Sequence, residues 1–175
     1  MADPRNKNLK GPAALFLFLC ISPIMQGQDT LPSVQKVSLL FMGDIMGHDS
    51  QINAAAIPGT GTYDYREVFM HVKPLIDSSD FSASNLEVTL AGPPYKGYPQ
   101  FSSPSALAAA CTEAGIDCLF TANNHSADRG KSGIISTLDR LDSIGIPHTG
   151  TFRNKTSRDT LQPLVVNRNG ISVAF

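Results

Sequence analysis

The stretch Val37-Ser38-Leu39-Leu40-Phe41-Met42-Gly43-Asp44 decides the fold class, because it is a nearly continuous apolar run that ends at a glycine and a carboxylate. Runs of this kind are typical of strands buried on both faces of a parallel sheet. Further strands are expected at residues 80–85 and 117–122, with a shorter one at residues 146–148. We therefore expect four strands of one sheet, the first ending at Met42.

Helical patterns separate these strands. Tyr65 to Ile76 repeats apolar residues at helical spacing, but Pro74 should kink or restart that helix. A second helix should begin at Ser103-Pro104 and end at Gly115. A third should carry Ile135, Leu138 and Leu141 and end at Gly145. The alternation predicts an α/β fold with right-handed crossovers and a mainly parallel sheet.

Two segments fall outside this rhythm. Residues 88–100 are rich in proline and glycine and predict a long exposed loop. Residues 164–166 and 171–175 flank Asn-Arg-Asn-Gly, which predicts a hairpin. The sequence stops inside the last apolar run, so we expect either a final edge hairpin or a fragment of a longer domain.

Composition limits the possible classes of protein. The 175 residues are 42% hydrophobic and 17% charged, enough apolar material for one globular domain. The net charge of −1 and the pI near 6.4 give no basic surface for nucleic acid, which we therefore exclude as a partner.

The N-terminus predicts export. Arg5, Lys7 and Lys10 precede an uncharged apolar run at residues 13–25, as in a secretory signal peptide. We assign residues 1–27 to the signal peptide, 28–36 to a linker and 37–175 to the folded domain. An uncleaved N-terminal anchor is the alternative. Either way we expect a periplasmic or cell-envelope-associated protein.

Two cysteines follow the signal segment. Cys111 falls on a predicted helix and Cys118 opens a predicted strand. An oxidising compartment would permit a disulfide between them, but both positions also suit simple apolar packing. The sequence leaves these alternatives open.

Polar side chains follow three successive predicted strands. Ligands of open α/β sheets bind at such strand ends, where loops and backbone amides converge. Carboxylate, amide and imidazole groups together suit Mn²⁺, Zn²⁺, Fe or Ca²⁺. The three ends carry, in order, Asp44 and His48; Asn85 and Glu87; Asn123, Asn124, His125 and Asp128.

Each of these residues also has an ordinary structural interpretation. Asp44 could accept hydrogen bonds from loop amides, and His48 could be a surface residue. Asn85 and Glu87 could face water, and Asp128 could cap the following helix. Coincidence at three consecutive strand ends is less expected than at one, so we favour a site.

The other histidines carry less weight. Asn124 and His125 need partners if they are buried, which makes them the strongest pair. His71 lies between apolar helix residues and is most simply half-exposed. His148 ends the fourth strand and is a supporting candidate, with packing or a loop hydrogen bond as the alternative.

Three motifs resemble a known family. Residues 41–46 (Phe-Met-Gly-Asp-Ile-Met), 84–87 (Ser-Asn-Leu-Glu) and 121–130 (Thr-Ala-Asn-Asn-His-Ser-Ala-Asp-Arg-Gly) are similar to bacterial capsule-synthesis proteins of the CapA type. These are also called poly-gamma-glutamate capsule proteins and resemble calcineurin-like metallophosphoesterases. The similarity covers about residues 37–175, and Asn-Asn-His-x-x-Asp is its most specific part.

The resemblance implies a fold and a set of site residues. The fold would be a layered α/β/β/α sandwich, truncated here, with a mainly parallel first sheet. Asp44 and Glu87 would bind a divalent metal (Mn, Zn or Fe), possibly as part of a dinuclear site. Asn124 and His125 would take the place of the phosphoesterase Asn-His pair, with His125 as acid/base group or ligand. His48, Asn85, Asn123, Asp128 and His148 would support them.

The sequence departs from phosphoesterases in two ways. Glu87 follows Asn-Leu where phosphoesterases usually have Gly-Asp, which puts phosphoester hydrolysis in doubt. Members of the family also continue further and bring late histidines, whereas no histidine follows His148 here. We therefore expect residues 28–175 alone to fold poorly and to bind metal weakly.

Three functions follow from the resemblance. The favoured one is assembly, export or release of an anionic envelope polymer such as polyglutamate or capsule, together with polymer-synthesis membrane proteins. The alternatives are a metal-dependent phosphoesterase or other hydrolase, and a polymer-binding module without turnover.

Overall fold

A parallel sheet organises the chain, as the apolar runs predict. The structure is a computed structural model that describes residues 34–175, so the predicted signal peptide and most of the linker lie outside the described residues. The strands are β1 (Leu39–Ile45), β2 (Phe81–Leu86), β3 (Cys118–Phe120) and β4 (His148–Thr149), hydrogen-bonded in the order β1-β2-β3-β4. Each pair is parallel, which confirms the predicted α/β class.

Helices connect the strands and begin and end close to the predicted points. The predicted helix at 65–76 is divided into α2 (Arg66–Phe69) and α3 (Lys73–Asp77), and Pro74 lies in the first turn of α3. Helix α4 (Ala106–Ala114) and α5 (Gly130–Ile144) end at Gly115 and Gly145, which adopt left-handed backbone angles. Helices α1 (Asp49–Ala55) and α6 (Lys155–Leu161) were not predicted.

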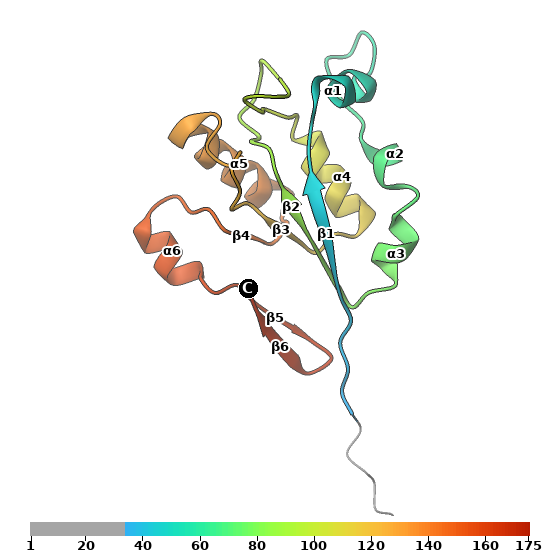
Figure 1. Cartoon of the computed structure of the whole chain (residues 1–175), viewed down its shortest axis with the longest axis vertical. Coiled ribbons are helices and arrows are strands. Elements are labelled where there is room, and N and C mark those ends of the chain that lie inside the picture. Colours follow the sequence, from blue (N-terminus) through green and yellow to red (C-terminus); the bar gives the residue numbers. More distant parts are fainter. Residues whose placement is uncertain (1–33) are drawn as a thin grey trace, which may run out of the picture. The chain divides into compact units, whose positions relative to one another are not determined.

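The helices that connect the strands cover one face of the sheet (Figure 1). One core cluster joins Leu86 and Leu119 of the sheet to Leu107 of α4 and Leu141 of α5. Because the strand order follows the chain order, crossovers of one hand place all connecting helices on the same side.

The opposite face carries a smaller cluster. Phe81, Ala83 and Cys118 are buried there, with Leu39, Phe120, Leu164, Val166 and Phe175 packed against them. The last three belong to or flank the predicted hairpin, now seen as β5 (Val165–Arg168) and β6 (Ile171–Ala174). Asn169 and Gly170 both have positive φ (52° and 77°), the geometry of a two-residue hairpin turn.

Strand β1 contains a bulge before its polar end. Met42 pairs with Ser84, but Asp44 pairs with Asn85, so Gly43 is an extra residue. Its carbonyl oxygen accepts a hydrogen bond from Ser84 Oγ (2.7 Å). The strand also extends three residues beyond its predicted end, to Ile45.

The structure decides between the alternatives for the cysteines. Cys111 and Cys118 are both free and buried. They belong to different clusters, Cys111 on the helix side and Cys118 on the hairpin side. The packing interpretation therefore holds, and the disulfide is excluded.

Within residues 34–175, no helix is both long enough and apolar enough to cross a bilayer.

Candidate functional site

Asn85 joins the two candidate carboxylates. Its amide nitrogen donates to Asp44 Oδ1 and to Glu87 Oε2, each at 2.8 Å. The parallel pairing of β1 with β2 places Asp44 opposite Asn85, and Glu87 N bonds to Ile45 O (3.0 Å) just beyond it. The sheet therefore fixes both carboxylates at its carboxyl end, as the sequence predicts.

Asn123 connects the third strand end to this pair. Its amide nitrogen donates to Asn85 Oδ1 (3.0 Å) and to Leu86 O (2.9 Å), while its Oδ1 accepts from His125 N (3.0 Å). Both side-chain ends are used, so the loop after β3 has one defined position relative to β2. Asn124, by contrast, is exposed.

His125 is held by Asp128. Its Nδ1 lies 2.8 Å from Asp128 Oδ2, and both side chains are largely buried. With the carboxylate facing Nδ1, that nitrogen carries the proton in the neutral ring, and Nε2 is left as the acceptor. Phe101 N donates to the same Asp128 oxygen (2.7 Å), which fixes the carboxylate from the other side.

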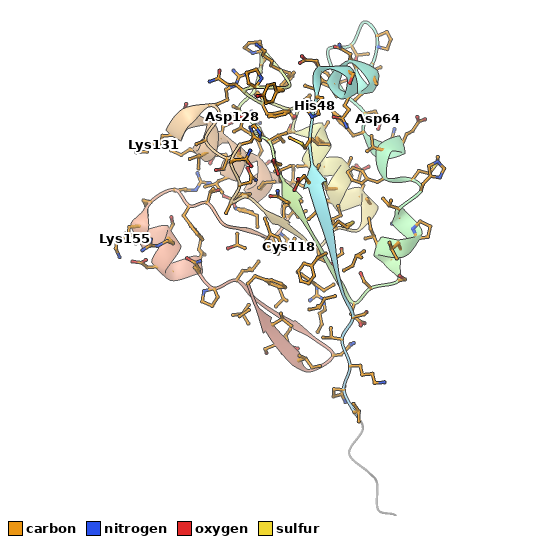
Figure 2. All side chains as sticks on the ribbon, in the orientation of Figure 1. His48, Asp64, Cys118, Asp128, Lys131 and Lys155 are labelled. Atoms are coloured by element: carbon orange, nitrogen blue, oxygen red, sulfur yellow. The ribbon has the colours of Figure 1, made fainter. Side chains whose placement is uncertain are left out.

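Phe101 is a residue of the site that the sequence analysis missed. Its fully buried ring meets His125 edge-on at 4.7 Å and His48 at 5.1 Å between ring centroids. Figure 2 shows His48 and Asp128 near the same end of the sheet. The missed signal was a phenylalanine inside a polar, proline-rich loop.

The loop that carries Phe101 is fixed next to the site. Gly97 N donates to Asp49 Oδ1 (2.6 Å), and a Cβ at Gly97 would lie 2.6 Å from Asp49 N. Arg129, next to Asp128, donates to the carbonyl oxygens of Pro94 (3.3 Å) and Gln100 (3.4 Å). The predicted exposed loop is therefore partly buried and supports the His125–Asp128 pair.

His148 lies outside this network. Its Nδ1 is 3.0 Å from Ile146 O, and its Nε2 is 3.8 Å from Asp142 Oδ1. It begins β4, whereas the sequence analysis placed it at the end of that strand. His148 therefore lies next to Asp142 of α5 and, in the described part of the chain, makes no hydrogen bond to the other candidate site residues.

The environment of Glu87 favours its neutral form. Burial and the neighbouring Asp44 carboxylate raise the pKa of Glu87 above its ordinary value, against smaller opposing effects of His125 and the Asn85 hydrogen bond. No lysine or arginine forms a salt bridge with Asp44 or Glu87 within residues 34–175. The pair thus lacks a positive counterpart and is chemically suited to a cation.

The described residues supply only part of a metal ligand set. Two carboxylates and amide oxygens suit an oxygen-preferring divalent ion. Within residues 34–175, however, no group of three or more His, Cys, Asp or Glu side chains gathers closely enough to hold one. Asp44 and Glu87 fit a metal as two of its ligands, and His125 is engaged with Asp128.

A cavity opens beside the site, on the hairpin side of the sheet. It measures about 450 Å³ and is lined by Asn85, Phe120, Ala122, Thr149, Gly150, Gln162 and Phe175. Asn85 therefore contacts both the carboxylate pair and the cavity. Of the residues in the hydrogen-bonded site, Asn85 is the one that lines this cavity.

The sheet and the site define the chain as an α/β protein with a paired-carboxylate and histidine site at the ends of parallel strands. Residues 38–175 match the family described as "Bacterial capsule synthesis protein PGA_cap". The chain belongs to this family of bacterial capsule synthesis proteins, which confirms the resemblance inferred from its motifs.

One curated relative adds to this assignment. "Capsule biosynthesis protein CapA" of Bacillus anthracis is 30% identical over 148 residues, which cover 80% of this chain and 34% of that protein. The chain thus spans about a third of the length of the relative that it matches.

Proposed function

We propose that the protein acts in capsule biosynthesis as a metal-dependent hydrolase of an anionic envelope polymer such as polyglutamate. One observation carries the proposal: Asn85 holds Asp44 and Glu87 together, and no lysine or arginine of residues 34–175 forms a salt bridge with either carboxylate. Asn123 joins Asn85 to the loop of His125 and Asp128. Carboxylates that face each other in this way need a proton or a cation between them.

Each residue has a separate task in this proposal. Asp44 and Glu87 would hold the metal, which when bound polarises the scissile carbonyl or phosphoryl group and supplies a nucleophile. Asn85 and Asn123 fix the strand ends. His125, with Nδ1 bound to Asp128, keeps Nε2 free to move a proton to or from the reacting group.

The test uses the whole protein after removal of metal with EDTA and reloading with Mn²⁺ or Zn²⁺. We expect metal-dependent shortening of polyglutamate, measured by gel filtration, and its loss in Asp44→Asn and Glu87→Gln. His125→Ala should lose turnover but retain metal. Asp159→Asn, an exposed carboxylate on α6, is the matched control. Turnover that survives EDTA would contradict the proposal.

A binding module without turnover is the second candidate, favoured by the absence of a three-residue ligand cluster within residues 34–175. In that case the protein should bind polyglutamate in a metal-dependent way and release no shorter product. Cleavage of a generic phosphodiester, with no effect on polyglutamate, would instead indicate a phosphoesterase.

The place of action follows from the same proposal. Work on an envelope polymer requires export, in agreement with the predicted signal peptide at residues 1–27, and contact with polymer-synthesis membrane proteins. Fractionation of cells that express the whole protein tests this location directly.

A further inference from the structure

Two imidazole rings at the site pack against the same phenyl ring. The ring of Phe101 meets His125 at 4.7 Å between centroids with an interplanar angle of 80°, and it meets His48 at 5.1 Å and 76°. Both contacts are edge-on, an arrangement that aromatic pairs prefer. The three rings come from the loops after β1, β2 and β3, so this aromatic series connects three strand ends.

Phe101 is fixed through both its ring and its backbone. The residue is fully buried. Its N donates to Asp128 Oδ2 (2.7 Å), and its O accepts from Thr89 Oγ1 (2.6 Å). The next residue, Ser102, exchanges two backbone hydrogen bonds with Lys96 across the loop (2.9 and 3.0 Å). Phe101 is therefore a firm surface against which other rings can be oriented.

The side chain of His125 is held from two directions. Its Nδ1 lies 2.8 Å from Asp128 Oδ2, the same oxygen that accepts from Phe101 N. A single hydrogen bond fixes one point of a ring and leaves the ring free to pivot about that point. The edge-on contact with Phe101 supplies a second point. Phe101 thus acts on His125 directly through its ring and indirectly through Asp128.

The main chain of His125 is held separately. Its N donates to Asn123 Oδ1 (3.0 Å), and Asn123 Nδ2 donates to Asn85 Oδ1 (3.0 Å). These bonds fix the backbone of His125 relative to the carboxylate pair without help from Phe101. What Phe101 adds is the direction of the imidazole ring, and with it the direction of Nε2.

His48 lies at the other end of the aromatic series. It is exposed, and its backbone is fixed at the beginning of α1, where its N donates to Gln51 Oε1 (2.8 Å) and its O accepts from Ile52 N (2.9 Å). In the described part of the chain, no hydrogen bond joins His48 to the carboxylate pair. The contact of its ring with Phe101 is therefore its link to His125.

We infer that Phe101 is a positioning residue for His125, and that the ring of His48 acts on His125 through Phe101. The inference rests on the proposed function, because it takes His125 as the group that moves a proton. A proton passes between atoms within hydrogen-bond reach, so the direction of Nε2 decides how often the reacting group can be served. A misplacement of about 1 Å can cost on the order of a hundredfold in rate.

The first experiment compares two fully buried phenylalanines in the whole metal-loaded protein. Phe101→Leu keeps an apolar side chain but removes the aromatic edge, and Phe81→Leu makes the same change in the cluster on the hairpin side of the sheet. Both changes should lower the melting temperature. Only Phe101→Leu should lower kcat for polyglutamate, by about tenfold or more, with KM and metal content as in wild type.

A spectroscopic measurement reports on the imidazole ring itself. In Zn²⁺-loaded protein with ¹⁵N-labelled histidine at about pH 8, wild type should show His125 with its proton on Nδ1, the nitrogen that faces Asp128. Phe101→Leu should show a mixture of the two neutral tautomers, because the freed ring can turn away from Asp128. Phe81→Leu should show the wild-type signal.

Two variants of His48 test the outer contact. His48→Ala removes the ring and should lower kcat, though less than Phe101→Leu does. His48→Phe gives Phe101 a ring to pack against and should recover most of that loss. Metal content should match wild type in both variants. Equal kcat in the two variants, or loss of metal from both, would overturn the role of the His48 ring.

The outcomes for Phe101 separate positioning from the proposed hydrolysis. Wild-type kcat together with a single tautomer in Phe101→Leu would overturn the positioning role and leave the hydrolase standing. An equal loss of kcat in Phe81→Leu would also overturn it, because the effect would then follow from lost packing in general. If wild type does not shorten polyglutamate, the hydrolase fails, and the tautomers of His125 alone decide whether Phe101 positions it.

Discussion

At the scale of single residues, the geometry of the site depends on the side-chain amides of two asparagines as much as on charged side chains. The side-chain nitrogen of Asn85 donates to both carboxylates, and its side-chain oxygen accepts a hydrogen bond from Asn123. One side chain therefore connects the ends of β1, β2 and β3. Neither asparagine is charged, yet Asn85 holds the two carboxylates together and Asn123 joins the loop of His125 to Asn85. The chemistry of Asp44 and Glu87 is therefore set by neutral neighbours.

The first prediction concerns the raised pKa of Glu87. A carboxyl whose pKa is higher in the folded than in the unfolded protein binds its proton more tightly when folded, so stability falls as pH rises above the ordinary value of 4.5. Glu87→Gln has no such proton to lose. In EDTA, the variant should gain stability relative to wild type between about pH 4 and about pH 8.

Urea unfolding at both pH values measures this difference. Asp159→Asn, far from the carboxylate pair in sequence and exposed on α6, controls for a simple change of net charge. A difference between wild type and Glu87→Gln that stays constant with pH would show that folding does not raise the pKa of Glu87.

The second prediction concerns the two buried cysteines. Burial raises the pKa of Cys111 and of Cys118 to about 12, with the neighbouring Asp117 adding to the effect at Cys118. Thiolates are the reactive form, so both thiols should react very slowly with Ellman's reagent at about pH 8 and rapidly after unfolding. The third cysteine of the sequence, Cys20 in the apolar run at residues 13–25, must be replaced by serine for this assay. Fast labelling of the folded protein would be the contrary result.

At the scale of elements, the loop between β2 and α4 is the main departure from expectation. Proline and glycine content predicted an exposed loop at residues 88–100, yet Val88 and Leu90 within it are buried, and so is Phe101 just beyond it. Proline and glycine content predicts where the chain turns, but it does not predict which side chain of a loop is buried. That choice depends on His48 and His125, which are distant in the sequence.

The third prediction tests how closely this loop is attached. Gly97→Ala would place a Cβ 2.6 Å from Asp49 N and 2.9 Å from His48 Cα, both backbone atoms that cannot yield easily. We expect a loss of about 1–3 kcal/mol in the free energy of unfolding, as for other overpacked sites. Gly43→Ala has nothing within 4 Å of its new Cβ and should have little effect.

The helices and strands themselves were predictable because their signals are local. An apolar run located β1, β2 and β3 lie close to the strands expected at residues 80–85 and 117–122, and Pro74 divided the first predicted helix as expected. The short α1 and α6 carry little apolar periodicity, so they escaped prediction. The roles of Asn85 and Asn123 in joining the strand ends needed the sheet register, which sequence alone does not contain.

At the scale of the whole described region, the two faces of the sheet are unequal. The helix side buries the larger cluster, whereas the other face is covered only in part, and Phe41 there remains 56% exposed. Phe175 connects the hairpin to this face, with ring centroids 5.3 Å from Phe81 and 5.6 Å from Phe120. The hairpin therefore depends on aromatic contacts.

The fourth prediction tests that dependence. Phe175→Ala should lower the free energy of unfolding by no more than the about 1.5–3 kcal/mol of a fully buried apolar side chain, because Phe175 is only partly buried. It should also increase binding of the dye ANS to the exposed face. Val165→Ala, at an exposed hairpin position, is the control, and equal effects of the two changes would refute the role of Phe175.

The bulge at Gly43 has a consequence for comparing and redesigning such chains. Strict alternation from Leu39 would assign Asp44 to the helix-covered face, but the extra residue places it opposite Asn85, with Phe41 and the hairpin side. The regular alternation of side chains along a strand therefore assigns Asp44 and Ile45 to the wrong faces of the sheet. Removing Gly43 would restore regular pairing and leave both residues on their present faces, whereas inserting a residue after it would exchange them. At this strand, an inserted residue therefore changes the face on which the site carboxylate lies, whereas a deletion at the bulge does not.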